Sequence, residues 1–276
     1  MITIIWHTSI EKSWEKDWIE YLFAKVPHHT ITDYKQELII PNSLIVYNSS
    51  VNIQAYLERA QGTQFGLIHL SDEWGTDDTS LYSYAQIVFR NYYKDLGPNV
   101  INFPLGCMKG IPYDVQPRPI VERTLTWSFS GHVDKTTRPD MAKYMINIPN
   151  GKYYFKKTGQ NWGAFEGHKL DPIDLFNMYS DSIFVPCPRG NQSIDSLRVC
   201  EALEAGAIPI VERSDYWSKL YGTDNPLVQI DSWSVAPSII TMLLSDTTRL
   251  EYQRQYTHNW WKNYCNKLQS NIVDLL

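Results

Sequence analysis

The sequence predicts an α/β protein of two domains, each built on a parallel sheet. Short apolar runs of strand length alternate with helix-length segments along the chain, which is typical of parallel sheets whose strands are connected by helices. A segment rich in Gly and Pro, residues 106–118 (GCMKGIPYDVQPR), interrupts this alternation and has the composition of an interdomain linker. At 276 residues the chain is long enough for two domains of ordinary size.

The first half of the chain has the pattern of buried strands joined by short helices. Helical spacing of apolar residues follows Ser13 and recurs after Ile53. Apolar runs predict strands at 2–6, 43–47, 65–70, 85–93 and 100–104. We therefore expect a parallel, doubly wound sheet in this half.

The second half repeats the alternation after the Gly/Pro-rich segment. Apolar runs predict strands at 124–130, 153–156, 182–185, 207–211 and 227–230. Helical patterns separate them at 139–146, 172–179, 195–205, 216–220 and 235–244. A last helical pattern, 247–268, carries an aromatic residue at every fourth position, namely Tyr252, Tyr256, Trp260 and Tyr264.

The composition is that of a soluble globular protein, since 43% of the residues are hydrophobic and 20% are charged. The net charge of -5 provides no basic footprint, so we expect no nucleic-acid partner. The opening run ITIIW is too short for a signal-peptide core, and no run of about 18 apolar residues occurs in the sequence. We therefore expect a cytoplasmic protein without a membrane span.

The four cysteines, Cys107, Cys187, Cys200 and Cys265, lie far apart in the sequence. The sequence contains no CxxC pair and no His at metal-ligand spacing beside a cysteine. Zinc and redox motifs are therefore not indicated, and we expect reduced thiols.

The stretch Ser182–Val211 combines a strand, a Pro/Gly turn, an amphipathic helix and a second strand. In open α/β sheets ligands bind at the carboxyl ends of strands, where a helix N-terminus attracts anions. The turn carries Arg189, and the helix carries Arg198 and Glu201. These charges indicate a nucleotide-sugar site. The i, i+3, i+6 spacing of Asp195, Arg198 and Glu201 fits a salt-bridged, solvated helix face equally well.

Several motifs of this stretch occur together: Pro188-Arg189-Gly190, Ser196–Arg198, Glu201-Ala202, and Gly206 followed by Ile208-Pro209-Ile210. The set resembles the exostosin-like glycosyltransferases of family 47 and relatives of the ribitol-xylosyltransferase type. Three N-terminal segments are similar to the acceptor-side half of such enzymes, namely FGLIHLSDEW (65–74), RNYY (90–93) and FPLG (103–106).

The resemblance implies a GT-B fold, in which two Rossmann-like domains face each other across a cleft. Residues 1–118 would form the acceptor-side domain and residues 119–250 the nucleotide-sugar donor domain. The helix of residues 251–276 would cross back to the first domain. The resemblance also implies inversion at the anomeric carbon without an essential metal or other cofactor.

We predict that the donor diphosphate is neutralised by Arg189, Arg198 and the helix N-terminus, because guanidinium groups match phosphate oxygens. Glu201, one turn further along the helix, would accept hydrogen bonds from both ribose hydroxyls. The remaining residues predicted from the same loop and helix start are Gly190, Asn191 and Ser196.

A second donor-binding segment is predicted where strand 124–130 ends. Gly131 and His132 would bind phosphate through backbone N–H groups, and Arg138 would add a cation. An ordinary βα turn has the same composition, so both interpretations stand.

Inverting transfer requires a base that removes the proton of the acceptor hydroxyl. Asp72 and Glu73 follow strand 65–70 at its carboxyl end, where a base of the first domain is expected. His7, after the first strand, is the second candidate, and an ordinary loop residue is an equal interpretation of it. His69 lies inside the strand, where a satisfied core histidine is the better interpretation.

The acidic pair Asp77-Asp78 is not a DxD motif and lies outside the predicted donor domain, so we assign it no metal.

These observations predict a metal-independent, inverting glycosyltransferase that moves xylose from UDP-xylose onto a glycan acceptor with β-linkage. UDP-glucuronate and UDP-galactose are alternative donors. The expected partners are a nucleotide-sugar donor and an oligosaccharide or glycoprotein acceptor. Two other functions compatible with the sequence are a non-catalytic nucleotide-sugar or glycan-binding module on the same fold, and a sugar-phosphate or nucleotide hydrolase.

Overall fold

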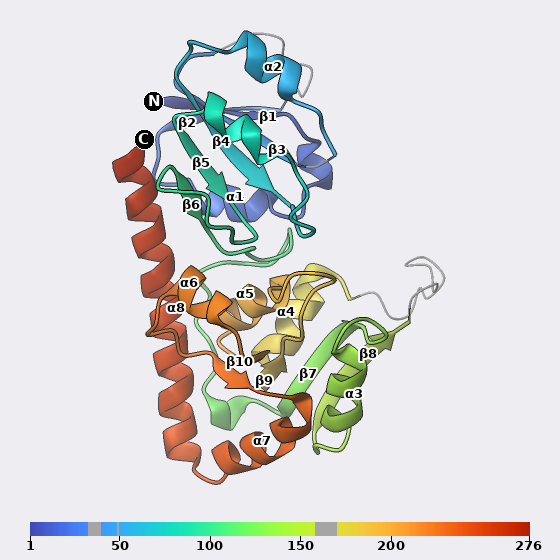
Figure 1. The fold of residues 1–276 in the computed structure, drawn as a ribbon. Coiled ribbons are helices and arrows are strands. Elements are labelled where there is room, and N and C mark those ends of the chain that lie inside the picture. The colour runs from blue at the N-terminus through green and yellow to red at the C-terminus, as the bar shows by residue number, and fades with distance from the viewer. Residues whose placement is uncertain (33–39, 49, 158–169) are drawn as a thin grey trace. The chain divides into compact units, whose positions relative to one another are not determined.

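The computed structural model describes residues 1–32, 40–48, 50–157 and 170–276. The chain divides into two compact units (Figure 1). Unit 1 comprises Met1–Leu105 and Cys265–Leu276, and unit 2 comprises Gly106–Tyr264. None of the helices in the described ranges is both long and apolar enough to cross a bilayer.

The described part of unit 1 contains a six-stranded sheet whose neighbouring strands are all parallel. The strand order is β2-β1-β3-β4-β5-β6. The strands are β1 (Ile2–Trp6), β2 (His28–Ile31), β3 (Ser43–Asn48), β4 (Phe65–Leu70), β5 (Ile87–Arg90) and β6 (Val100–Asn102). The helical connections are η1 (Ile10–Lys12), α1 (Lys16–Leu22), α2 (Gln54–Arg59) and η2 (Thr79–Tyr84).

Burial explains why most strands of unit 1 are recognisable in the sequence and one is not. All six residues of β4 are buried, as expected of a central parallel strand covered on both faces. The strand β2 (HHTI) pairs only with β1 among the described strands, and none of its residues is fully buried. It lacks the apolar run that predicts the other strands, because an edge strand has little surface to bury.

The described part of unit 2 contains a five-stranded parallel sheet with the order β11-β10-β9-β7-β8. The strands are β7 (Leu125–His132), β8 (Gly151–Lys156), β9 (Ser182–Pro186), β10 (Ile208–Glu212) and β11 (Val228–Ile230). The helices are η3 (Ile120–Glu122), α3 (Arg138–Met145), α4 (Pro172–Ser180), α5 (Leu197–Glu204), α6 (Asp215–Tyr221), η4 (Trp233–Val235), α7 (Ala236–Leu244) and α8 (Thr247–Leu275). The two sheets confirm the predicted α/β class.

The segment 106–118 is part of unit 2 rather than a free linker. Cys107 and Ile111 are buried, and the Met108 N–H donates to Glu201 Oε1 at 3.3 Å. The Asp114 N–H donates to Glu204 Oε1 at 2.6 Å. The Gly and Pro residues therefore mark an irregular segment whose backbone N–H groups are satisfied by two carboxylates of α5. The compact units divide between residues 105 and 106, not near 118.

The long helix α8 contributes residues to both units. Its residues up to Tyr264 belong to unit 2 and those from Cys265 onward to unit 1. Within unit 1, Gln269 Nε2 donates a 2.8 Å hydrogen bond to the carbonyl oxygen of Tyr21 in α1.

Buried Arg123 joins several segments of unit 2 through carbonyl oxygens. Its Nη1 donates to Ser182 O at 2.6 Å, and its Nη2 donates to Ala205 O at 3.2 Å. Its Nε donates to Arg118 O at 3.0 Å. Burial, and secondly the nearby positive charge of Arg254, lower the pKa of Arg123 to about 9. One cation thus satisfies the start of β9, the end of α5 and the segment before η3.

We expect Arg123→Ala to lower the free energy of unfolding by about 3 kcal/mol, because several buried carbonyl groups would lose their donor. Urea denaturation followed by circular dichroism measures this change. Arg118→Ala is the matched control, since its side chain is 54% exposed and its ion pair with Asp181 is long at 3.7 Å. The control should change stability by about 0.5 kcal/mol or less. Equal effects of the two substitutions would contradict the assignment.

Candidate functional site

The predicted donor-binding residues lie together in unit 2, at the carboxyl ends of the adjacent strands β7 and β9. Gly131 and His132 end β7, and Arg138 is the first residue of α3. The β9–α5 loop and α5 supply the rest, namely Arg189, Gly190, Asn191, Ser196, Arg198 and Glu201. This edge of a parallel sheet is where ligands bind in open α/β folds.

Hydrogen bonds join the β7–α3 loop to the β9–α5 loop. Arg138 Nε donates to Arg189 O at 3.1 Å. Thr136 Oγ1 donates to Gly190 O at 3.3 Å, and Lys135 Nζ donates to Asn191 Oδ1 at 3.0 Å. These hydrogen bonds tie together two segments that carry the cations of Lys135, Arg138 and Arg189.

Arg198 is held close to the end of β7. Its Nη2 donates to Ser130 O at 2.8 Å, and its guanidinium carbon lies 4.7 Å from the centre of the Phe129 ring. A Cβ on Gly131 would lie 2.2 Å from Arg198 Nη2, and Gly131 has a φ of 147°. The positive φ favours glycine there, and a side chain at this position would also displace the Arg198 guanidinium.

Two groups of the β9–α5 segment are buried with no hydrogen-bond partner among the described residues: Arg189 Nε in the loop and Ser196 Oγ at the start of α5. Ser196 is the N-cap of α5, but its side chain makes no capping bond. Buried polar groups are normally satisfied, so an unpartnered Ser196 Oγ at a helix N-terminus is expected where an anion or water binds.

The helix-face alternative for Asp195, Arg198 and Glu201 is wrong. Asp195 and Glu201 are buried, and in the described part of the chain no ion pair within 4 Å joins any two of the three. Burial raises the pKa of Glu201 to about 7 and that of Asp195 also to about 7. The helix begins at Leu197, after the expected start at Asp195. Asp195 instead accepts hydrogen bonds from Ser196 N–H (2.8 Å) and the Tyr216 hydroxyl (3.0 Å).

The predicted catalytic residues lie in unit 1, at the carboxyl ends of β1 and β4. Asp72 is buried, and both of its oxygens accept hydrogen bonds. Oδ2 accepts from Arg90 Nη2 at 3.0 Å, and Oδ1 accepts from the Thr76 N–H at 3.0 Å. Its observed contacts are therefore those of a residue that orders its loop. Glu73, the next residue, is half-buried.

His69 is a satisfied core histidine, as interpreted from the sequence. Its Nε2 contacts Asp77 Oδ2 at 2.8 Å, and its Nδ1 contacts the Tyr82 hydroxyl at 2.6 Å. Potential ligand atoms of His69, Asp72 and Asp77 lie within 4.8 Å of one another, close enough for one metal ion. The Arg90 guanidinium already places a positive charge beside Asp72. This charge lowers the attraction of the three side chains for a metal cation.

His7 follows β1 and is 5% exposed. Its ring packs against Tyr56 with a centroid distance of 4.3 Å, and Nε2 has no hydrogen-bond partner among the described residues. Burial lowers the pKa of His7, so the neutral ring predominates at neutral pH. A neutral imidazole can accept a proton, and the Nε2 atom of His7 is itself buried in this structure.

Glu15 is a buried carboxylate beside the predicted catalytic loop of unit 1, and it was not identified from the sequence. It is buried just before α1 and accepts hydrogen bonds from Ser13 Oγ (3.2 Å), from Ser71 Oγ, and from Asn91 Nδ2 (3.4 Å). A glutamate in a polar loop gives no sequence signal of burial. Its donors lie up to 76 positions away, so only the folded chain identifies it.

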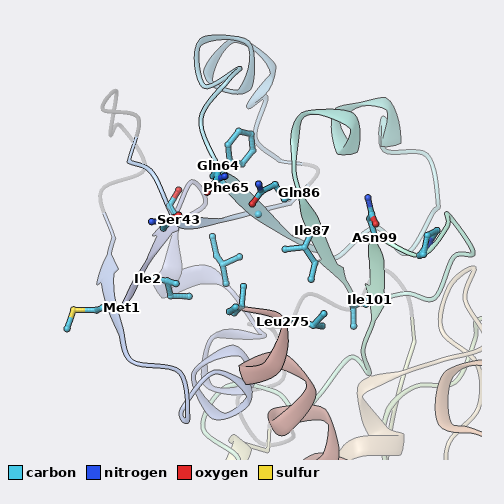
Figure 2. A pocket seen from close by; sticks show the side chains of 15 residues that line it. Met1, Ile2, Ser43, Gln64, Phe65, Gln86, Ile87, Asn99, Ile101 and Leu275 are labelled. Carbon is cyan, nitrogen blue, oxygen red and sulfur yellow. The ribbon is translucent and has the colours of Figure 1, made fainter.

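A separate cavity of about 500 Å³ lies in unit 1 at the amino-terminal ends of the strands (Figure 2). Its lining includes Ser43, Gln64, Gln86 and Asn99 but no residue with a titratable side chain. It lies at the opposite strand ends from His7 and Asp72, and we do not place the chemistry there.

Comparisons with known proteins agree at the level of the fold. No family model and no curated protein matches the sequence. The fold is similar to that of T4 phage β-glucosyltransferase in complex with UDP-glucose, with a TM-score of 0.55 and 12% identity over 99% of this chain and 98% of that one. It is also similar to an α1,3-fucosyltransferase, with a TM-score of 0.53 and 10% identity over 98% of this chain and 90% of that one. An α-glucosyltransferase in complex with UDP and DNA has a TM-score of 0.57 and 11% identity over 99% of this chain and 98% of that one. These are GT-B structures, and the chain has that fold.

We expect Asp72→Asn to lower the free energy of unfolding by about 3 kcal/mol, because Arg90 would keep its charge in a buried site without a counter-ion. Asp231→Asn is the matched control, since it breaks an exposed Asp–Arg pair with Arg213. The control should cost about 0.5 kcal/mol or less. Thermal and urea denaturation measure both, and an unchanged stability for Asp72→Asn would refute its structural role.

Proposed function

We propose that the protein is a glycosyltransferase that uses a UDP-linked sugar as donor. The observation that carries this proposal is the group of cations at the carboxyl ends of β7 and β9 in unit 2. Arg189 and Arg198 contact carbonyl oxygens there, and the buried Arg189 Nε and Ser196 Oγ lack partners among the described residues. Two of the similar structures hold UDP or UDP-glucose, which supports the same ligand class here.

The residues of unit 2 would stabilise the leaving nucleoside diphosphate. Negative charge develops on the diphosphate as the glycosidic bond breaks, so preorganised cations and N–H groups lower the barrier. Arg198 is already positioned by Ser130 and Phe129, and Arg138 couples the two loops that would surround the phosphates. Little reorganisation is then needed when the donor binds.

Glu201 would recognise the ribose. It is a buried carboxyl with one oxygen on the Met108 N–H at 3.3 Å, which leaves acceptor capacity for ribose hydroxyls. Its raised pKa follows from burial, and two hydroxyl donors would favour the ionised form.

We further propose His7 as the general base. It combines a neutral ring with an Nε2 that accepts no hydrogen bond within the described structure. Asp72 is the weaker candidate because Arg90 and two backbone N–H groups occupy its oxygens. Glu73, the residue after Asp72, is the third candidate for the base.

The finer specificity is also a proposal. The exostosin-like motifs support an inverting, metal-independent enzyme of the ribitol-xylosyltransferase type, with UDP-xylose as donor and a β-linked product on an oligosaccharide or glycoprotein. For the acceptor, DNA is the alternative to a glycan, because some similar structures are of a DNA-modifying enzyme or contain DNA. The net charge of -5 favours a glycan over DNA, because phosphate backbones select basic surfaces. Activity in excess chelator would support metal independence.

Substitution of His7 tests the base. We expect His7→Phe, which keeps an aromatic ring against Tyr56, to lower kcat by about 100-fold or more while UDP-glucose binding stays unchanged. Radiolabel transfer to acceptor measures turnover, with donor hydrolysis measured in parallel. Glu73→Gln is the comparison variant. If His7→Phe kept full turnover and Glu73→Gln lost it, Glu73 rather than His7 would be the general base.

The wild-type protein itself separates an enzyme from a non-catalytic binding module. An enzyme hydrolyses the donor slowly in the absence of acceptor, whereas a module binds UDP-sugar without turnover. Binding without any hydrolysis or transfer across UDP-xylose, UDP-glucuronate and UDP-galactose would favour the module.

The pH dependence of donor binding tests Glu201. The folded protein holds this group protonated below about pH 7, so its ionisation and the affinity for UDP-glucose should both rise from pH 6 to pH 8. The increase is limited to about tenfold per pH unit for one proton. UDP-glucose is the probe because its diphosphate carries constant charge in this range. Calorimetry measures the slope.

Glu201→Gln keeps the acceptor for Met108 and should abolish the slope. Asp195→Asn is the control, because burial also raises the pKa of Asp195 to about 7. Loss of the slope in Asp195→Asn, with retention in Glu201→Gln, would refute the ribose assignment.

A further inference from the structure

The part of α8 in unit 2 presents a row of aromatic side chains. Tyr252, Tyr256 and Trp260 stand four residues apart, which spaces successive side chains by about 6 Å along the helix. Tyr252 is 71% exposed and Tyr256 is 47% exposed. Exposed aromatic rings in a contiguous row mark a binding surface more often than isolated apolar residues do.

A second row of neutral amides runs beside the aromatic row at the same spacing. Gln255, Asn259 and Asn263 all line one groove of about 430 Å³ together with the three rings and Asp224 of the α6–β11 loop. We call this the α8 groove. Asp224 is its single charged residue, and no Lys or Arg lines it.

Trp260, at the inner end of the aromatic row, is held by neighbouring rings. It stacks on Tyr264 at a centroid distance of 5.5 Å and meets the buried Tyr221 edge-on at 5.7 Å. Its ring is therefore positioned before any ligand binds, which reduces the entropy lost on binding.

The chemistry of the α8 groove selects one ligand class. Flat rings offer apolar faces to the C–H surfaces of pyranose rings, and Tyr adds a polar tip. Amide side chains both donate and accept hydrogen bonds, as hydroxyl-rich ligands require, and a carboxylate accepts from two hydroxyls. A phosphate-bearing ligand would meet one carboxylate and no cation.

We propose that the α8 groove binds a neutral oligosaccharide chain, separately from the donor-binding cluster. The regular 6 Å spacing of rings and amides suits a repeating ligand that contacts successive turns of the helix. None of the proposed donor residues lines the groove. The inference does not depend on the proposed transferase activity, because a binding module would have the same groove.

The probes are cellohexaose, xylohexaose and maltohexaose, titrated into the full-length protein by calorimetry and tryptophan fluorescence. We expect at least one to bind with a Kd of about 1 mM or tighter. Tyr256→Ala and Tyr252→Ala should each weaken that binding by about tenfold, and Tyr256→Phe should retain most of it because the ring face remains. Val121→Ala, 81% exposed in the same unit, is the control and should bind like wild type.

UDP-glucose binding is measured on every variant, and it should be unchanged in the tyrosine variants. Arg198→Ala should keep oligosaccharide binding while losing UDP-glucose binding, which separates failure of this proposal from failure of the proposed function. Absence of binding by all three probes would overturn the proposal. It would also be overturned if both tyrosine-to-alanine variants bound the sugar like wild type, or if the groove captured a protein partner while binding no oligosaccharide.

Discussion

The guanidinium of Arg198 on the carbonyl of Ser130 is the contact that organises unit 2. It brings a cation from α5 to the end of β7, beside Gly131, whose positive φ favours glycine. The ring of Phe129 beneath the guanidinium adds a cation–π contact. The remaining predicted donor residues are arranged around this point, because Arg138 ties the two loops that meet there.

The cationic side chains of the protein are balanced in two ways. In unit 1, Arg90 is paired with Asp72, and in unit 2 Lys262 is paired with Glu204 and Asp114. Arg198 and Arg189 instead contact carbonyl dipoles, which stabilise a guanidinium without cancelling its charge. Among the described residues no ion pair within 4 Å neutralises Arg189 or Arg198, so both guanidinium groups could pair with an incoming diphosphate.

Two irregular features show why parts of the fold escape prediction. β2 has no apolar run because it pairs on one side only in the described sheet, so its sequence is polar. Residues 106–118 have a linker-like composition, yet they supply the N–H groups that satisfy Glu201 and Glu204. In both cases the deciding partner lies far away in the sequence, and no local pattern reports it.

The sequence by itself determined the α/β class, most strand positions and the placement of Arg189, Arg198 and Glu201 on the loop and helix that follow one strand. Apolar runs and helix periodicity are local signals, so these features need no knowledge of distant residues. The tertiary structure alone decided which polar groups are buried and how they are partnered. It pairs Asp72 with Arg90, leaves His7 Nε2 without a partner among the described residues, and raises the pKa of Glu201. Burial and hydrogen bonding set these properties, and both arise only when segments far apart in the chain come together.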